Sequence, residues 1–587
     1  MFEQVIDPVG GSLGLSALCA VIPLATLFVL LGVLRVKAWI AGLVALVVAI
    51  VVATVAFSMP VDQALLSASE GAAFGFFPIL WIVLNAIWVY NLTVATGHFD
   101  VLRRSFEKVS PDQRIQAIII AFCFGALLEA LAGFGTPVAI TVVMLMAMGF
   151  QPIKAAAVAL IANTAPVAFG ALATPIVTLA TVTSGVHDDS RLTVETLGAM
   201  VGRQTPILAA IVPLVLVLVV DGRRGLRETW LPALTAGAAF GLAQFVASNY
   251  ISVPLTDIVA ALVSAAAVVL VVRMRPSAVS PETAPTATPA RAGSAGAAGR
   301  VGVTVGGELG GAPGRQRPRD EGAPASGVGS DGQEPLADNR SEVIKAYAPY
   351  GIIVVIFALA NLAPVKAALA EAPWTTVFAW PGLHVFGPGA DAPLASTNYT
   401  FNWLPAAGTL MFLAGIVTAI VLRVSPGRAL RAYGQTYYEL RWAIVTVMAV
   451  LALAYVMNQS GQTATLGAAL AETGTFFAFL SPILGWIGVA VTGSDTSANA
   501  LFGALQVQTA AGAGLDPVLL AAANSSGGVL GKMISPQNLA IAAAAVGMAG
   551  REGELFRKVF GWSVTLLLFM CVIVVLQSTP VLGWMVP

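Results

Sequence analysis

Long apolar runs constrain this chain more than any other feature. Runs of the length that a helix needs to cross a bilayer, about 20 residues, recur along the 587-residue sequence, and the first covers 13–34. Only 10% of the residues are charged and the mean hydropathy is +0.85, whereas soluble domains carry about 25% charge. The sequence therefore predicts an all-α polytopic membrane protein with about 12–14 transmembrane segments.

Charge and cysteine usage exclude several classes of partner. The formal net charge is zero, so nothing in it favours a nucleic-acid partner. Cys19, Cys123 and Cys571 stand singly in apolar runs, where they read as small hydrophobic residues, not as a disulfide set or a metal site. No cofactor is expected. The N-terminus is not expected to be a signal peptide. Glu3 and Asp7 precede the first apolar run, whereas a signal peptide carries cations in that position.

Residues 276–341 differ in kind from the rest of the chain. They are rich in Pro, Gly, Ala, Ser and Arg and have almost no large apolar side chains, so they cannot bury enough surface to fold. We expect a disordered linker between two membrane halves, 1–275 and 342–587.

The loops predict an orientation, because cation-rich loops mark the cytoplasmic side. On this rule six segments are cytoplasmic: 35–37, 98–114, 221–228, 273–341, 423–441 and 551–558. The acidic or neutral segments are extracytoplasmic: 1–10, 58–70, 185–195, 248–256, 364–402 and 581–587. The linker is then cytoplasmic, and both termini are extracytoplasmic.

Two irregular apolar regions, 115–184 and 460–550, resemble each other. GFGT, beginning at Gly133, is echoed by GSDT, beginning at Gly493. Asn-Thr at 163–164 is echoed by Asn-Ser at 524–525, and in each copy a hydroxyl-Pro pair ends 12 positions after the Asn, at Pro175 and Pro536. By the predicted loop locations, region 115–184 begins at the cytoplasmic side and ends outside, whereas region 460–550 begins outside and ends at the cytoplasmic side. The two copies therefore cross the bilayer in opposite directions. Inverted repeats with broken helices are the architecture of many secondary transporters; chance similarity in a Gly/Ala/Thr-rich chain is the alternative.

The stretch 125–140, GALLEALAGFGTPVAI, combines two costly features. It places the ionisable Glu129 at membrane depth and, one turn later, the helix-weakening Gly133, Gly135 and Pro137. A carboxylate there is usually retained for function, and a broken helix is tolerated only where it is buried or lines a cavity. We expect Glu129 to load and release a proton; a structural carboxylate bonded to the broken backbone is the alternative.

The second region supplies further polar candidates. Asp495 lies in the small polar run TGSDTSANA, where it serves coupling or caps a helix. Lys532 is the only cation between Arg441 and Arg551; it pairs with a substrate carboxylate, Glu129 or Asp495, or snorkels to an interface. The uncharged groups at matching places are expected to bind substrate or to bond helix to helix: Thr136, Asn163, Thr164, Thr496, Asn524, Ser525 and Ser526. Glu70 and Arg203 are expected at the membrane interface.

These segments resemble the lactate permease family. The likeness rests on LLEALAGFGTPVAI (127–140), IANTAPVAFGALATPI (161–176), GWIGVAVTGSDTSANALFGALQ (485–506) and SSGGVLGKMISPQNLAIA (525–542), in the expected order. The resemblance implies a symporter of the cytoplasmic membrane that takes up L-lactate with a proton, with related members accepting D-lactate or glycolate. The family's motif glutamate maps to Glu129 and its lysine to Lys532.

Three alternatives stay open at this point. In a sodium-coupled carboxylate transporter, Asp495 and unwound carbonyls would hold the ion. A membrane-embedded enzyme would need a set such as HExxH or paired catalytic aspartates, and none occurs in the sequence, so no enzymatic activity is expected. A passive channel is disfavoured because no ring-forming charged repeat is present.

Overall fold

The computed structural model describes residues 1–274 and 339–587, apart from 108, 111, 134, 187–188, 390–391 and 549–550. Within these residues ten helical segments are long and apolar enough to cross a membrane, or eleven when the bent pair Pro152–Ala162 and Val167–Thr183 is counted as one span. The expected all-α polytopic membrane fold is confirmed. The expected linker at 276–341 lies outside the described residues as far as 338, and helix α13 begins at Arg340.

The α-helices of the first half are α1 (Leu13–Phe28), α2 (Ala38–Val55), α3 (Val61–Phe74), α4 (Trp81–Ala95), α5 (His98–Glu107), α6 (Gln113–Gln116), α7 (Gly125–Ala132), α8 (Thr136–Ala147), α9 (Pro152–Ala162), α10 (Gly170–Thr183), α11 (Val194–Val246) and α12 (Thr256–Met274). Those of the second half are α13 (Arg340–Ala360), α14 (Ala363–Leu369), α15 (Ala407–Val421), α16 (Pro426–Gln459), α17 (Gln462–Ala471), α18 (Phe477–Thr492), α19 (Asp495–Ala513), α20 (Pro517–Gly531), α21 (Pro536–Ala545) and α22 (Glu552–Gln577).

Two features account for the larger number of segments expected from the sequence. Helix α11 is counted once although it has 53 residues, and its backbone leaves the helical region at Asp221 and at Gly222, where φ is 61°. At 1.5 Å per residue a helix of that length is far longer than a bilayer is thick. Two further apolar helices, α8 and α15, are shorter than a full span.

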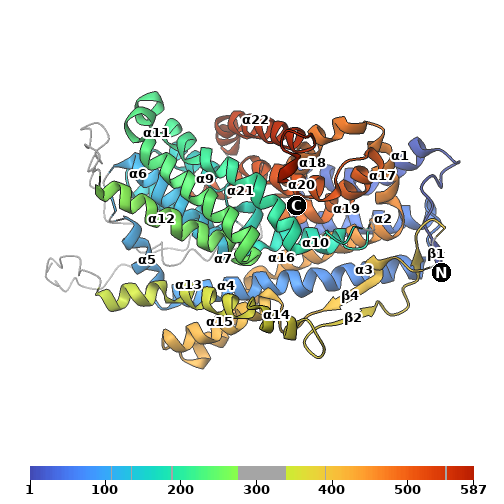
Figure 1. Ribbon diagram of the computed structural model, residues 1–587, viewed down its shortest axis with the longest axis horizontal. Helices are drawn as coiled ribbons and strands as arrows, with labels where there is room; N and C mark the ends of the chain where they lie inside the picture. Colours follow the sequence, from blue (N-terminus) through green and yellow to red (C-terminus); the bar gives the residue numbers. More distant parts are fainter. Residues whose placement is uncertain are drawn as a thin grey trace, which may run out of the picture.

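The two halves of the chain are interleaved. Helix α16 of the second half packs against α2 and α3 of the first, α15 packs against α4, and α10 packs against α19. In Figure 1 the orange α16 accordingly lies beside the blue α3 and α4. The buried hydrophobic side chains form clusters that draw on both halves. The site described below therefore lies within a shared body of helices.

Two small sheets add to the helices. Strand β1 (Phe2–Glu3) pairs in parallel with β3 (Val385–Phe386), and β2 (Thr376–Ala379) pairs antiparallel with β4 (Asn398–Phe401). In Figure 1 β1 lies beside the N-terminus, and β2 and β4 lie below α3. The segment 364–402 therefore contains paired strands. The sequence did not predict them, because it has no long run of alternating polar and apolar residues there.

The stretch 58–70 also differs from expectation. The sequence predicts Glu70 at the membrane interface, but α3 begins at Val61 and Glu70 is fully buried within the protein. The amide of Gln459 donates to Glu70 Oε2 at 2.7 Å, and the Gln63 amide donates to the Gly382 carbonyl. Partners on distant segments thus make it possible to bury these polar side chains, and a local sequence pattern does not show them.

Local signals set the ends of the helices near the site. Pro152, Pro517 and Pro536 occupy the first turns of α9, α20 and α21, where a missing N–H costs nothing. The Ser494 hydroxyl caps α19 by accepting the Ser497 N–H at 3.3 Å. Such caps allow helices to begin inside the protein without leaving all of their first N–H groups unsatisfied.

Candidate functional site

Two helix breaks occur where the glycines predicted them. Helix α7 ends at Ala132, directly before Gly133, and α8 begins after Gly135, whose φ is 86°. Helix α18 ends at Thr492, directly before Gly493, whose φ is 76°, and α19 begins two residues later. Both positive φ angles lie where glycine is favoured, since a Cβ is strained there.

Two further breaks face the first pair. In α10 the backbone is left-handed at Ala171, Leu172 and Ala173, with φ of 44°, 56° and 59°, and the Thr174 hydroxyl closes this turn by donating to the Ala171 carbonyl. A 3-10 turn precedes α21, and there the Ser535 hydroxyl donates in the same way to the carbonyl three residues earlier. Each turn is followed by proline.

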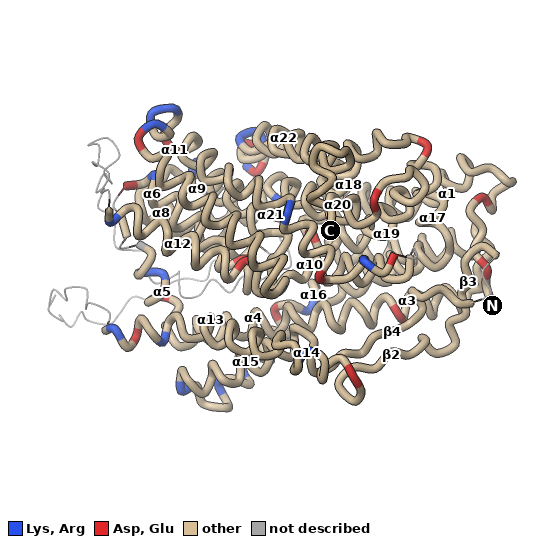
Figure 2. Tube along the Cα trace, viewed as in Figure 1, with Lys and Arg blue, Asp and Glu red and all other residues tan. Residues whose placement is uncertain are grey.

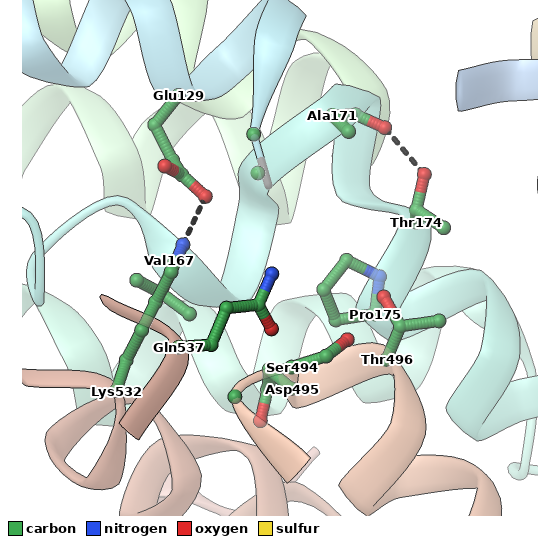
Figure 3. A pocket seen from close by; sticks show the side chains of 13 residues that line it. Glu129, Val167, Ala171, Thr174, Pro175, Ser494, Asp495, Thr496, Lys532 and Gln537 are labelled. Carbon is green, nitrogen blue, oxygen red and sulfur yellow. Dashed lines mark hydrogen bonds and ion pairs between the residues drawn. The ribbon is translucent and has the colours of Figure 1, made fainter. Parts of the chain in front are cut away.

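The four breaks surround one cavity (Figure 3). Its wall is formed by Glu129, Gly133, Val167, Gly170, Ala171, Thr174, Pro175, Gly493, Ser494, Asp495, Thr496, Lys532 and Gln537. The chain therefore brings both irregular regions together around a single cavity.

An ion pair crosses from one region to the other at this cavity. Lys532 Nζ lies 2.5 Å from Glu129 Oε1, and the two side chains are 7% and 4% exposed. The Asn163 amide donates to Glu129 Oε2 at 2.9 Å. Two glycines leave room for the carboxylate, because a Cβ at Gly170 would lie 2.9 Å from Oε1 and one at Gly133 would lie 3.3 Å from it.

A second carboxylate lines the same cavity. The Ser525 hydroxyl donates to Asp495 Oδ2 at 2.5 Å, and the Asn499 amide lies 3.4 Å from the same oxygen. The other oxygen, Oδ1, is buried and has no hydrogen-bond partner among the described residues. Asn499 also donates to the Pro175 carbonyl at 3.1 Å, which joins the two regions behind the cavity.

The predicted site residues at or near the cavity fall into three groups. Those that line the cavity are Glu129, Gly133, Pro175, Gly493, Asp495, Thr496 and Lys532. Asn163 and Ser525 hold the two carboxylates from behind. Gly135, Pro137 and Pro536 shape the breaks without lining the cavity.

The remaining predicted residues bond elsewhere in the described structure. The Thr164 hydroxyl donates to the Ile161 carbonyl within its own helix. Asn524 is engaged with other buried amides, and the Ser526 hydroxyl donates to Gln204 at 2.6 Å. Thr136 begins α8 and is outside the cavity wall.

Glu70 and Arg203, the weaker candidates, do not line the cavity. Arg203 lies near the start of α11, where it donates to Asn249 Oδ1 at 2.9 Å and to the Met585 carbonyl. Glu70 lies on α3 beside Gln459, as described above. Both are therefore placed in contacts between helices, away from the carboxylate–lysine pair.

Sequence reasoning missed Gln537, whose side chain enters the cavity from the start of α21 (Figure 3). The signal was present, because Gln537 is the polar residue directly after the Ser-Pro pair of the quoted motif. It also missed Asn499, four residues after Asp495 on the same helix face. Among the described residues no group of three or more His, Cys, Asp or Glu side chains is arranged to hold a metal ion.

Comparison with known proteins gives the chain a family. It is 42% identical to the glycolate permease GlcA of Escherichia coli (strain K12), over 100% of this chain and 99% of the relative. It is 39% identical to the L-lactate permease of Bacillus subtilis (strain 168), over the full length of both. The match to the crystal structure of the Alcanivorax borkumensis YdaH transporter covers 84% of each chain at 16% identity, with a TM-score of 0.40. The family model described as L-lactate permease matches residues 16–306 and 316–581, so this chain belongs to the L-lactate permease family.

Proposed function

We propose that this protein imports L-lactate and related 2-hydroxymonocarboxylates, such as D-lactate and glycolate, across the cytoplasmic membrane by proton symport. The relatives named L-lactate permease and glycolate permease support this substrate class. The observation that carries the mechanism is the buried pair of Glu129 and Lys532 in the wall of the shared cavity.

The pair offers a direct way to couple a proton to an anion. While Glu129 is ionised, it forms an ion pair with Lys532. A substrate carboxylate then has no free cation to bind, because the Lys532 ammonium group is already paired. When a proton neutralises Glu129, Lys532 is left as a buried cation that needs another anion, because an unpaired buried charge is costly. The lactate carboxylate supplies that anion. Proton and substrate thus favour each other's binding, as symport requires.

The neighbouring groups have supporting roles in this proposal. Asn163 orients the Glu129 carboxylate from behind. Asp495 and Thr496, the first residues of α19, line the cavity, and a helix N-terminus favours an anion. Asp495 is a second candidate for proton coupling, since its free Oδ1 is buried close to the cavity.

We further propose that regions 115–184 and 460–550 are inverted repeats within halves 1–275 and 342–587. Support comes from the paired helix breaks at Gly133 and Gly493 and from the matching hydroxyl-to-carbonyl bonds of Thr174 and Ser535. An arrangement of this kind lets one repeat move against the other around a fixed site.

The proposed orientation places linker 276–341 in the cytoplasm and both termini outside. Figure 2 supports it, because Lys and Arg gather toward the end of the molecule that carries α5, α6 and the bend of α11, away from the N-terminus. Cysteines introduced singly at Gly10 and Arg227, in a background without the three native cysteines, test it with a membrane-impermeant thiol reagent. Labelling of Arg227→Cys in intact cells would contradict the orientation.

The decisive experiment is counterflow in proteoliposomes. Vesicles holding the purified protein and unlabelled L-lactate should take up labelled L-lactate transiently, and glycolate and D-lactate should compete. An imposed inward proton gradient should then drive accumulation, which a protonophore and a potassium–proton exchanger together abolish. Protein-free vesicles control for diffusion of neutral lactic acid. Accumulation that persists without the pH gradient would refute proton coupling.

Sodium coupling is the competing proposal, and the free oxygen of Asp495 is the observation in its favour. Oxygen ligands from carboxylates and unwound backbone are what a sodium site requires. Uptake measured at fixed pH, with sodium replaced by choline, separates the two. A dependence on sodium with no response to the proton gradient would replace the proton proposal.

A further inference from the structure

We propose that the Gln537 side chain recognises the 2-hydroxyl group of the transported acid and so sets the preference for 2-hydroxy acids over unsubstituted ones. The inference rests on the proposed function and deepens it by giving one residue a role in specificity. It is carried by the position of the Gln537 amide and by its lack of a partner.

The cavity wall has few polar groups free to meet a ligand. Five of its polar side chains already have hydrogen-bond partners: Glu129, Thr174, Ser494, Asp495 and Lys532. The side chains of Thr496 and Gln537 make no hydrogen bond within the described part of the chain. Gln537 is also exposed, whereas Thr496 is only 6% exposed. The amide is therefore the most available neutral donor and acceptor in the wall.

Its placement suits a ligand held by Lys532. In Figure 3 the Gln537 amide lies between the Glu129–Lys532 pair on one side and Ser494 and Thr496 on the other. Gly493 makes room for it, because a Cβ at that position would lie 2.6 Å from Gln537 Oε1. A larger residue at position 493 would push the Gln537 amide away from the cavity.

The local turn does not require an amide at this position. The Ser535-Pro536 turn corresponds to the Thr174-Pro175 turn, and in both the hydroxyl bonds to the carbonyl three residues earlier. The residue after proline in the first turn is Ile176, which is fully buried. The same kind of turn thus forms with an apolar side chain, so the polarity of Gln537 serves something other than the turn.

The chemistry of the substrate matches what an amide offers. A 2-hydroxy acid carries a hydroxyl, both donor and acceptor, on the carbon next to its carboxylate. With the carboxylate on Lys532, the hydroxyl can donate to Gln537 Oε1 or accept from Nε2. A site built to bond a hydroxyl disfavours the analogue that lacks it, because its own polar group is then left unpaired.

The test compares L-lactate with propionate, which differs from it only in lacking the 2-hydroxyl. Counterflow of labelled L-lactate in proteoliposomes gives the inhibition constant of each acid for the wild type and for Gln537→Met. The matched control is Gln435→Met, because Gln435 is exposed on α16 and donates to Glu439, away from the cavity. Gln537→Leu repeats the measurement if the Met variant does not fold.

The expected result is a specific loss of preference. In Gln537→Met the ratio of propionate to lactate inhibition constants should fall by about two- to tenfold, the value of one neutral hydrogen bond. Gln435→Met should keep the wild-type ratio. An unchanged ratio in Gln537→Met, or equal weakening of both acids, would overturn the inference while wild-type counterflow still upheld the function. Absence of lactate counterflow in the wild type would instead overturn the proposed function, and the inference with it.

Discussion

Asn163 and Lys532 divide the Glu129 carboxylate between them: the amide of Asn163 bonds Oε2 at 2.9 Å, and the ammonium of Lys532 bonds Oε1 at 2.5 Å. Asn163 comes from the same region as Glu129, whereas Lys532 is 403 positions away. One contact fixes the carboxylate, and the other can be exchanged for a substrate. In this arrangement the protonation state of Glu129 determines whether Lys532 is free to bind an anion in the cavity.

Glu129→Gln should uncouple transport. A neutral amide imitates the protonated carboxyl group, so Lys532 remains available for lactate and counterflow should persist. Accumulation should be lost, whereas in the wild type an inward gradient of one pH unit can drive about tenfold accumulation by one-to-one symport. Labelled L-lactate uptake under an imposed pH gradient measures this. The control is Glu70→Gln, a buried carboxylate on α3 outside the cavity. Wild-type accumulation by Glu129→Gln would remove Glu129 from the coupling mechanism.

Lys532→Met should cost both stability and binding. It leaves Glu129 as a buried carboxylate without its cation, which typically destabilises a protein by about 3–5 kcal/mol. The double variant Glu129→Gln and Lys532→Met should recover most of the melting temperature in detergent, because no unpaired charge remains. It should not recover lactate binding, measured as ligand-induced thermal stabilisation. Binding by the double variant at wild-type affinity would show that Lys532 does not hold the substrate.

Many of the membrane-spanning helices could be predicted from the sequence, because the length of an apolar run is a local property of the chain. The first apolar run, 13–34, closely matches α1 and the π-helical turn after it. The interleaving of α3 with α16 does not follow, because it depends on contacts between distant segments. Glu70 illustrates the difference, since only its partner Gln459, 389 positions away, explains why it is buried.

The site was predictable to the extent that glycine and proline mark broken helices. Gly133 and Gly493 stand where α7 and α18 end, and the pairing of Lys532 with Glu129 was one of the alternatives open at the sequence level. The left-handed turn that begins at Ala171 was not predictable, because non-glycine residues rarely adopt positive φ. Nor was the orientation of Gln537, which depends on the room left by Gly493.

Ser525→Ala should weaken the environment of Asp495. The Ser525 hydroxyl is its closest donor, at 2.5 Å, and the remaining donor, Asn499, is 3.4 Å away. Losing a hydrogen bond to a charged group typically costs about 1.5–3 kcal/mol, so the melting temperature in detergent should fall. Combining Ser525→Ala with Asp495→Asn should remove most of this cost, because the charge is then absent. Additive losses in the double variant would show that the two side chains act independently.

Gly170→Ala should impair transport without a large loss of folding. The added methyl group would lie 2.9 Å from Glu129 Oε1 and 3.2 Å from its Cγ, so the carboxylate must move away from Lys532. Overpacking of this kind costs about 1–3 kcal/mol, and here it falls on the coupling pair. The expected result is lower proton-driven accumulation, with counterflow less affected. Gly351→Ala on α13 is the matched control, because a Cβ there has no heavy atom within 4 Å. Equal effects of the two substitutions would mean that the space around Glu129 is not critical for coupling.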